Sequence, residues 1–358
     1  MDLIRLLRKF TEAPGPSGYE QEIASTIKDV WEPLTDETYV DHLGSVVAVK
    51  RGGGAEPRQK LMLAAHLDEI GLMVKQIVEH EGYGFLRLTK IGGVDIRHLY
   101  GQRVLVHGRR EIKGVIGSLP GHMLPAEKRN KPYGFEELLV DLGMTSTKVN
   151  ELVSVGDFIT FRQPLRKMLG KSVTGKALDN RASVTAVTVC LDYLAGRQHE
   201  WDVIAVATSQ EETAYLGAYT STFTLKPDAA VAIDVTFGKG AGANDANTFS
   251  LGSGPVLDLG PNVHPGMQNA LRETAGALEM KISTGIHSRA SGTDAFAIQV
   301  SRAGVPTGLV AIPLRYMHTM VETVNTDDIK RTGRLLGEFI ARLDNDFLDE
   351  LAETMMEN

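Results

Sequence analysis

The stretch VIAVATSQEE, residues 203–212, joins a short apolar run to two adjacent glutamates. The run at 203–207 is continuous and rich in valine and isoleucine, which is typical of a strand buried on both faces. Two carboxylates at the end of such a strand are costly to desolvate unless a cation or a proton lies between them. Because neighbouring side chains on a strand point to opposite sides, we expect Glu211 and Glu212 to have different roles. One would hold a metal ion and the other would face what the metal activates, whereas the commoner alternative is a solvated loop with two surface acids.

Three other short apolar runs are each followed by a histidine or an aspartate, which are residue types that can bind metals. The pairs are 61–65 with His66, 229–233 with Asp234, and 307–312 with His318. In an open α/β sheet, ligands bind at the carboxyl ends of the strands. Helical patterns between the runs complete the expectation of an α/β fold with flanking helices. The expected helices cover 2–11, 19–30, 181–195, 216–222, 294–300 and a long amphipathic segment from about Asp327.

Residues 71–162 have a different pattern, because short β-like runs recur there between glycines, prolines and charged residues. Only 136–142 resembles a helix. We therefore expect a small β-rich domain inserted into the α/β domain. The predicted division is 1–70 and 165–358 for the catalytic domain, with 71–164 as the insertion.

Composition narrows the class of protein. The 358 residues are 42% hydrophobic and 23% charged, as in ordinary soluble proteins. The net charge of −7 and the lack of a dense basic block argue against a nucleic-acid partner. No apolar run reaches the roughly 20 residues of a membrane-spanning helix, and the first residues do not resemble a signal peptide. The single cysteine, Cys190, cannot form an intrachain disulfide, so we expect a cytoplasmic protein without membrane contact.

Five side chains form a candidate metal site: His66, Asp179, Glu212, Asp234 and His318. Imidazole nitrogen and carboxylate oxygen suit zinc, cobalt or manganese, and the lack of thiolates favours a catalytic site. Five ligands are too many for one open catalytic ion, so two ions about 3.5–4 Å apart fit better. Asp179 precedes a strongly apolar helix and is either its N-cap or a bridging carboxylate. Asp68 shares a side of the extended chain with His66 and could orient it.

The same residues carry a resemblance to the TET (tetrahedral) dinuclear-zinc aminopeptidases, which include glutamyl, leucyl and deblocking aminopeptidases. The matching motifs are AHLDEIG at 65–71, GKALDNR at 175–181, QEE at 210–212, AIDVT at 232–236, SGTDA at 291–295 and PLRYMH at 313–318. The segment GSLPGH at 117–122 is also similar. The combination is specific and spans most of the chain. The resemblance implies a mixed-sheet, zinc-exopeptidase-like catalytic domain.

This resemblance also implies a role for each site residue. His66 and Asp234 would hold one metal, Glu212 and His318 the other, and Asp179 would bridge them. Asp68 would orient His66, and Glu211 would be the general base.

The implied activity is metal-dependent removal of N-terminal amino acids from peptides with a free N-terminus. The resemblance further implies a homododecamer whose active sites face an inner chamber, assembled partly through the inserted domain. Two departures from the family pattern are TAYLG at 213–217, where VGLRG is frequent, and PGH at 120–122, where PPH is usual. Neither involves a proposed ligand, but both lie where substrate could bind.

Three rival interpretations remain at this point. A deacylase or carboxypeptidase would keep the two metals and change the substrate. A glycosidase would use Glu211 and Glu212, although its carboxyls must face each other about 5–9.5 Å apart across a sugar. A binding protein that has lost catalysis is opposed by the intact set of ligands.

Overall fold

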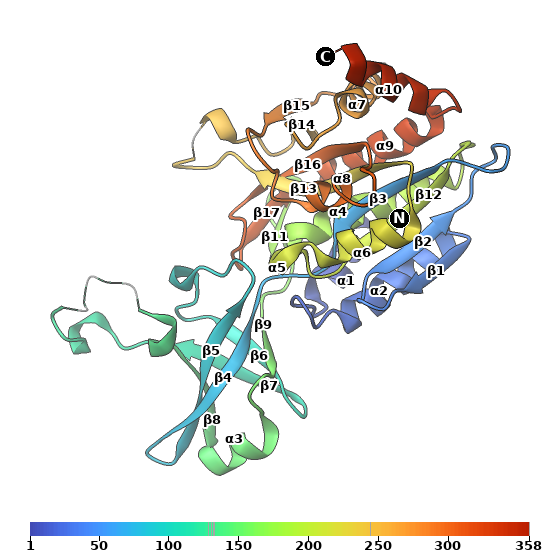
Figure 1. Ribbon diagram of the computed structural model, residues 1–358. Helices are drawn as coiled ribbons and strands as arrows, with labels where there is room; N and C mark the ends of the chain where they lie inside the picture. Colours follow the sequence, from blue (N-terminus) through green and yellow to red (C-terminus); the bar gives the residue numbers. More distant parts are fainter. Residues whose placement is uncertain (128, 130, 132, 244, 358) are drawn as a thin grey trace.

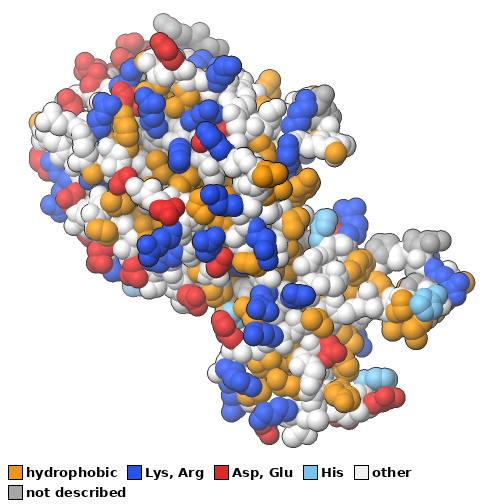
Figure 2. Space-filling model, turned by 180° about the vertical axis from the view of Figure 1, so that it is seen from behind, with side chains coloured by type: hydrophobic (Ala, Val, Ile, Leu, Met, Phe, Trp, Pro, Cys, Tyr) orange, Lys and Arg blue, Asp and Glu red, His pale blue; other side chains and the backbone are white. Residues whose placement is uncertain are grey.

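The computed structural model describes residues 1–127, 129, 131, 133–243 and 245–357. It consists of an α/β body, in which helices cover both faces of a sheet, and a β-barrel that projects from one side of that body (Figure 1). Among the described residues, no helix combines the length and the apolar character needed to cross a bilayer. Acidic and basic side chains are interspersed over the face shown in Figure 2.

The centre of the body is a mixed sheet, as expected from the sequence. Its middle strands run parallel, because each returns through a helix on a sheet face. They are β12 (Asp202–Thr208), β3 (Lys60–His66), β13 (Ala229–Phe237) and β16 (Thr307–Arg315), adjacent in that order. These strands are almost wholly buried, which explains why their sequences are continuous apolar runs.

Shorter strands extend the sheet at both edges. On one side lie β1 (Glu37–Val40) and β2 (Val46–Lys50), and on the other lie β17 (Glu322–Asn325), β11 (Ser172–Gly175) and β10 (Arg166–Lys167). Two more strands branch from β16, since β14 (Val256–Leu259) pairs antiparallel with it and parallel with β15 (Ser283–Ile286).

Helices cover the two faces of the sheet unequally. One face packs against α1 (Leu3–Glu12), α2 (Gln21–Trp31), α4 (Leu178–Leu194), α7 (Pro265–Ala277), α9 (Thr326–Arg342) and α10 (Phe347–Glu357). The other packs against α6 (Leu216–Leu225) and α8 (Asp294–Gln299). The amphipathic prediction for the last long helix is confirmed, because Ile329, Leu335, Phe339 and Ile340 of α9 are buried.

The projecting part is a closed six-stranded barrel. Its strands are, in spatial order, β4 (Gly71–His80), β5 (Tyr83–Ile91), β8 (Leu139–Thr145), β7 (Glu111–Gly117), β6 (Arg103–His107) and β9 (Phe158–Phe161). Burial alternates strictly along β7, so one set of side chains fills the barrel. Lys128, Asn130 and Pro132, which belong to the predicted insertion, lie outside the described residues. The division at 71–164 itself stays a prediction.

The helix expected at 136–142 is wrong. Residues 139–145 form β8, and the short helix of this region follows it as α3 (Ser146–Leu152). Val140 and Leu142 are two residues apart and both face the barrel core, which is the spacing of a strand. The apparent helical pattern came from adjacent leucines, one of which precedes the strand.

Candidate metal centre

The five predicted ligands meet at the carboxyl edge of the parallel strands. His66 ends β3 and Asp234 lies within β13, while His318 follows β16. Asp179 lies at the start of α4, and Glu212 lies in the short helix α5 (Glu211–Ala214). Two sets of three, His66 with Glu211 and Asp234 and His66 with Asp179 and Glu212, have ligand atoms within 4.8 Å of one another and could each hold a metal ion.

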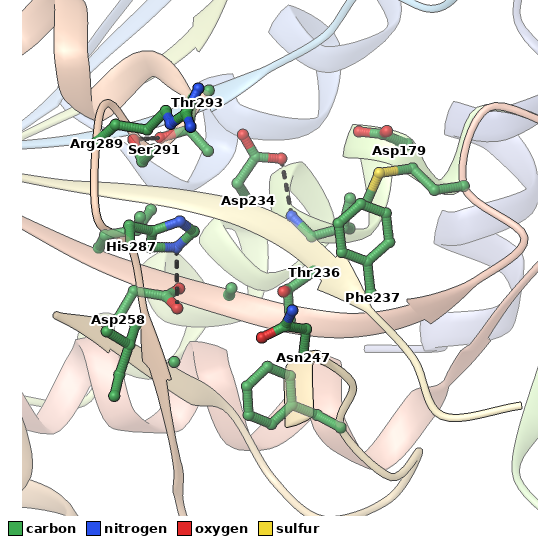
Figure 3. A pocket seen from close by; sticks show the side chains of 18 of the residues that line it. Asp179, Asp234, Thr236, Phe237, Asn247, Asp258, His287, Arg289, Ser291 and Thr293 are labelled. Carbon is green, nitrogen blue, oxygen red and sulfur yellow. Dashed lines mark hydrogen bonds and ion pairs between the residues drawn. The ribbon is translucent and has the colours of Figure 1, made fainter. Parts of the chain in front are cut away.

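Asp179 lies between the two histidines. Its Oδ1 is 3.2 Å from Nε2 of His66, and its Oδ2 is 3.3 Å from Nε2 of His318. A carboxylate that presents one oxygen to each of two imidazoles has the arrangement expected of a bridging ligand. The alternative of a helix N-cap is not supported, because among the described residues no backbone N–H of α4 donates to the Asp179 side chain, which instead faces the two histidines and the cavity (Figure 3).

The other ligands divide between the two histidines. Oδ1 of Asp234 lies 3.9 Å from Nε2 of His66, and Oε1 of Glu212 lies 3.3 Å from Nε2 of His318. Each histidine thus has its own carboxylate in addition to one oxygen of Asp179.

The two glutamates do not lie on a strand, so the geometric reason given for their division is wrong. Gln210 has a positive φ of 57°, which turns the chain sharply, and Glu211 begins α5. The division itself remains, because Oε2 of Glu211 is 3.7 Å from Nε2 of His66 whereas Glu212 approaches His318. A tight turn followed by one helical turn separates the two carboxylates.

Asp68 holds this turn in place. Its Oδ1 accepts the Glu211 N–H at 3.0 Å and its Oδ2 accepts the Glu212 N–H at 3.1 Å. Oδ1 is also 3.4 Å from Nδ1 of His66, and Oδ2 accepts a 2.5 Å hydrogen bond from Ser17 Oγ. Burial would raise the pKa of Asp68, but these hydrogen bonds and His66 lower it below its ordinary value.

The site carries an excess of buried negative charge. Burial, together with nearby carboxylates, raises the pKa of Glu211 to about 10 and raises that of Asp234 well above its ordinary value. Burial is also the main cause of the raised pKa of Glu212. Such a cluster is stable only when protons or cations compensate it, so the residues fit a site for divalent cations with nitrogen and oxygen ligands.

A buried glutamate behind the site, Glu322, was not predicted from the sequence. Glu322 of β17 accepts the His318 N–H at 2.9 Å and the Asp179 N–H at 3.1 Å. It therefore fixes the backbone of two ligands that come from distant parts of the chain. The available signal was its place four residues after His318.

Glu20 was also missed, and it supports the turn at Gln210. Its Oε1 accepts the Gly18 N–H at 2.7 Å and the Gln210 N–H at 3.2 Å. Burial, reinforced by the charge of Asp68, raises the pKa of Glu20 to about 7 from 4.5.

Replacing Glu20 by glutamine should therefore stabilise the protein at high pH. The folded state retains a proton that the unfolded chain releases near pH 4.5, so stability falls as the pH rises from about 4.5 through about 7. Glutamine cannot ionise and keeps an acceptor oxygen. At pH 8 we expect Glu20→Gln to melt at a higher temperature than the parent, with a free energy of unfolding that is larger by at most about 3 kcal/mol. The difference in stability should vanish near pH 4.5. Exposed Glu22 on the adjoining helix provides the control, Glu22→Gln, and an equal gap at both pH values would contradict the prediction.

Gly217 makes the turn around Glu211 possible. A Cβ at this position would overlap the backbone of Ser209 and lie 2.7 Å from Ser45 Oγ. We expect Gly217→Ala to lower the free energy of unfolding by about 1–3 kcal/mol, measured by denaturant melts. Gly196→Ala is the control, since its Cβ would meet nothing within 4 Å. Equal stability of the two variants would show that the turn tolerates the extra atom.

A cavity of about 760 Å³ opens next to the metal centre. Figure 3 shows Asp179, Asp234, Thr236 and Phe237 around this cavity, with Asp258 and His287 on another part of its wall. The departure at 213–217 reaches it through Tyr215, and Asn244 of the glycine-rich loop at 237–247 lies outside the described residues. His122, at the end of the motif at 117–122, lies on a barrel loop and does not line the cavity.

The connection after β5 brings the barrel against the metal centre. Gly92 has a positive φ of 75°, and a Cβ there would lie 3.2 Å from Oε2 of Glu212. A Cβ on Gly93 would lie 2.5 Å from Nδ1 of His318. The absence of side chains at these two glycines therefore leaves room for two of the candidate ligands.

Residues 44–335 match the model of the M42 glutamyl aminopeptidase family. This chain belongs to that family. The lysyl aminopeptidase of Pyrococcus furiosus is 33% identical over 94% of this chain and 96% of its own length. The structure of a TET aminopeptidase from the marine sediment archaeon Thaumarchaeota archaeon SCGC AB-539-E09 has a TM-score of 0.91 at 30% identity, over 98% of both chains. The TET1 peptidase of Pyrococcus horikoshii has a TM-score of 0.83 at 30% identity, over 96% of this chain and 100% of its own.

These comparisons confirm the resemblance found in the sequence motifs, and they show that this M42 chain is a peptide hydrolase of the aminopeptidase type. The mixed α/β fold is shared with the TET aminopeptidases. The individual roles of the site residues stay predictions.

Proposed function

We propose that this aminopeptidase works with two divalent cations, held by His66 and Asp234 on one side and by Glu212 and His318 on the other, with Asp179 between them. The observation that carries the proposal is the position of Asp179, whose two oxygens each face one histidine at 3.2 and 3.3 Å. Zinc is the expected metal, and cobalt and manganese suit the same nitrogen and oxygen ligands.

Glu211 is the proposed general base. When bound, two cations would lower the pKa of a water molecule and polarise the scissile carbonyl. Glu211 is not needed as a ligand in this scheme, and its carboxylate lies at the cavity wall 3.7 Å from His66. There it accepts a proton from the attacking water and returns it to the amine that leaves. Asp68 positions Glu211 through the backbone and His66 through the ring.

The proposed assembly is a homododecamer. The structure of the P. horikoshii TET1 peptidase is described as assembling into a tetrahedron or a large octahedral shell. The barrel projects from the body (Figure 1) and offers a separate surface for contacts between subunits. Substrates would be peptides with a free N-terminus, without nucleic-acid or membrane partners. The single cysteine is buried in α4, which agrees with a cytoplasmic location.

The test compares aminoacyl-p-nitroanilides with N-acetylated amino acids as substrates of the full chain. We expect hydrolysis of the anilides only, loss of activity after chelation, and recovery when zinc, cobalt or manganese is restored. Cleavage of the N-acetylated compounds instead would assign a deacylase. Activity that persists in fully chelated protein would remove the cations from the proposal.

A further inference from the structure

A buried acidic residue lies in the wall of the cavity away from the candidate ligands. Asp258 belongs to β14, and its side chain is 3% exposed. Its Oδ1 is 3.2 Å from Nε2 of His287, whose side chain is 30% exposed. Figure 3 shows this pair on one side of the cavity and Asp234 above it.

The surroundings of Asp258 are shaped to accommodate its carboxylate. Gly285 of β15 is its partner in the strand register, and a Cβ on Gly285 would overlap Oδ1 of Asp258. The carboxylate therefore occupies space that any other residue at 285 would fill. Within the described parts of the chain, no hydrogen bond joins a side-chain donor other than His287 to this carboxylate.

The charge of this part of the wall favours a cationic guest. His287 lies with its Nε2 at 3.2 Å from Asp258, and this contact raises the pKa of His287 above its ordinary value. When His287 is neutral, its Nε2–H donates to Asp258 and the carboxylate has no other cationic partner among the described residues. A buried carboxylate is costly without a cationic partner, so an incoming ammonium or guanidinium group gains more here than it would at the surface. An acidic guest would bring a second carboxylate next to Asp258. Arg289 also lines the cavity, but it is exposed at the rim rather than buried beside Asp258.

The distance from the metal centre suits a long side chain. Strands β13 and β14 flank β16, so two strand spacings, roughly 10 Å, separate the strand of Asp234 from that of Asp258. Leu309 and Ala311 of β16 line the cavity between them and offer an apolar surface. Lysine and arginine combine an apolar stem, which can lie on such a surface, with a cationic head.

Resting on the aminopeptidase function proposed above, we propose that Asp258 selects peptides whose N-terminal residue is lysine or arginine, by receiving the cationic head of that side chain. Asp258 is thus a specificity residue of the substrate cavity.

The experiment measures kcat/KM of the metal-loaded full chain for the p-nitroanilides of lysine, leucine and glutamate. We expect lysine to be preferred, and we expect Asp258→Asn to lower the lysine-to-leucine ratio at least tenfold. Gly285→Ala should lower the same ratio by displacing the carboxylate. Asp29→Asn, an exposed change on α2, and Gly276→Ala, where a Cβ would meet nothing within 4 Å, are the matched controls and should leave the ratio unchanged.

Each result separates the subsite from the activity. A preference for glutamate in the parent enzyme would overturn the proposal. It would indicate that His287 and Arg289, rather than Asp258, receive the substrate side chain. An unchanged lysine-to-leucine ratio in Asp258→Asn, with leucine still cleaved, would overturn it too. If no aminoacyl anilide is cleaved by the metal-loaded parent, the aminopeptidase proposal fails, and the selectivity proposed for Asp258 fails with it.

Discussion

Glu211→Gln should reduce kcat by roughly 10²–10⁴-fold while the protein keeps its metal. Glutamine has nearly the same shape, so the hydrogen bond from the backbone of residue 211 to Asp68 remains. It cannot accept the proton of the attacking water at neutral pH. The measurement is steady-state hydrolysis of an aminoacyl-p-nitroanilide, combined with metal content by mass spectrometry after dialysis.

The matched control is Glu273→Gln on the exposed side of α7. It changes the same functional group outside the cavity, and it should leave both rate and metal content at the parent level. Full activity of Glu211→Gln would show that another group takes the proton. A loss of metal together with activity would instead make Glu211 a ligand, which the set formed by His66, Glu211 and Asp234 permits.

Asp179→Asn should lose both bound metal and enzymatic activity. The parent carboxylate presents a charged oxygen to each histidine, whereas an amide offers one neutral oxygen and an NH₂ group that cannot bind a cation. We expect the metal content after dialysis to fall from two ions to one or none, and kcat/KM to fall more than about 100-fold.

Asp192→Asn, an exposed substitution on the same helix α4, is the control for this variant. Melting of both proteins in the presence of chelator distinguishes a local effect from unfolding, because Asp179→Asn should still unfold in one cooperative transition. Its midpoint should lie below that of the parent: burial would raise the pKa of Asp179, but the contacts with His318 and His66 lower it, so the charged form stabilises the fold. Retention of two ions by Asp179→Asn would show that Asp179 does not bridge them.

The sequence predicts the body of this fold well because its central strands are buried on both faces. Continuous apolar runs such as 61–65 and 229–233 can hardly be anything but internal strands when polar ligands follow them. The same reasoning placed His66, Asp234 and His318 at one edge of the sheet. The residues at these strand ends are therefore the part of the candidate site that local pattern can identify.

Features that depend on contacts between distant segments could not be predicted in this way. The turn at Gln210 forms because Asp68 and Glu20, from distant parts of the chain, accept hydrogen bonds from its backbone. None of these partners is marked by the local pattern around Glu211, so a strand was the natural expectation. The strand β8 was misjudged for a related reason, since its pairing with β5 and β7 is long-range and the isolated segment has only a weak alternation.

Asp258 illustrates a different limit of sequence reasoning. It lies in a short strand that branches from β16, and its neighbour His287 comes from a loop nearly thirty positions later. Only the branching sheet brings the two residues to one wall of the cavity. A specificity pocket built in this way becomes visible when the register of the strands is known.

The two glycines that follow β5 allow the barrel to pack closely against the candidate metal site. Because Gly92 and Gly93 have no side chains, the barrel chain packs closely against two candidate ligands, Glu212 and His318. A side chain at Gly93 would overlap the imidazole of His318, so the barrel chain and this ligand already lie close together. In the proposed assembly, subunit contacts made by the barrel would therefore also help to fix the positions of Glu212 and His318.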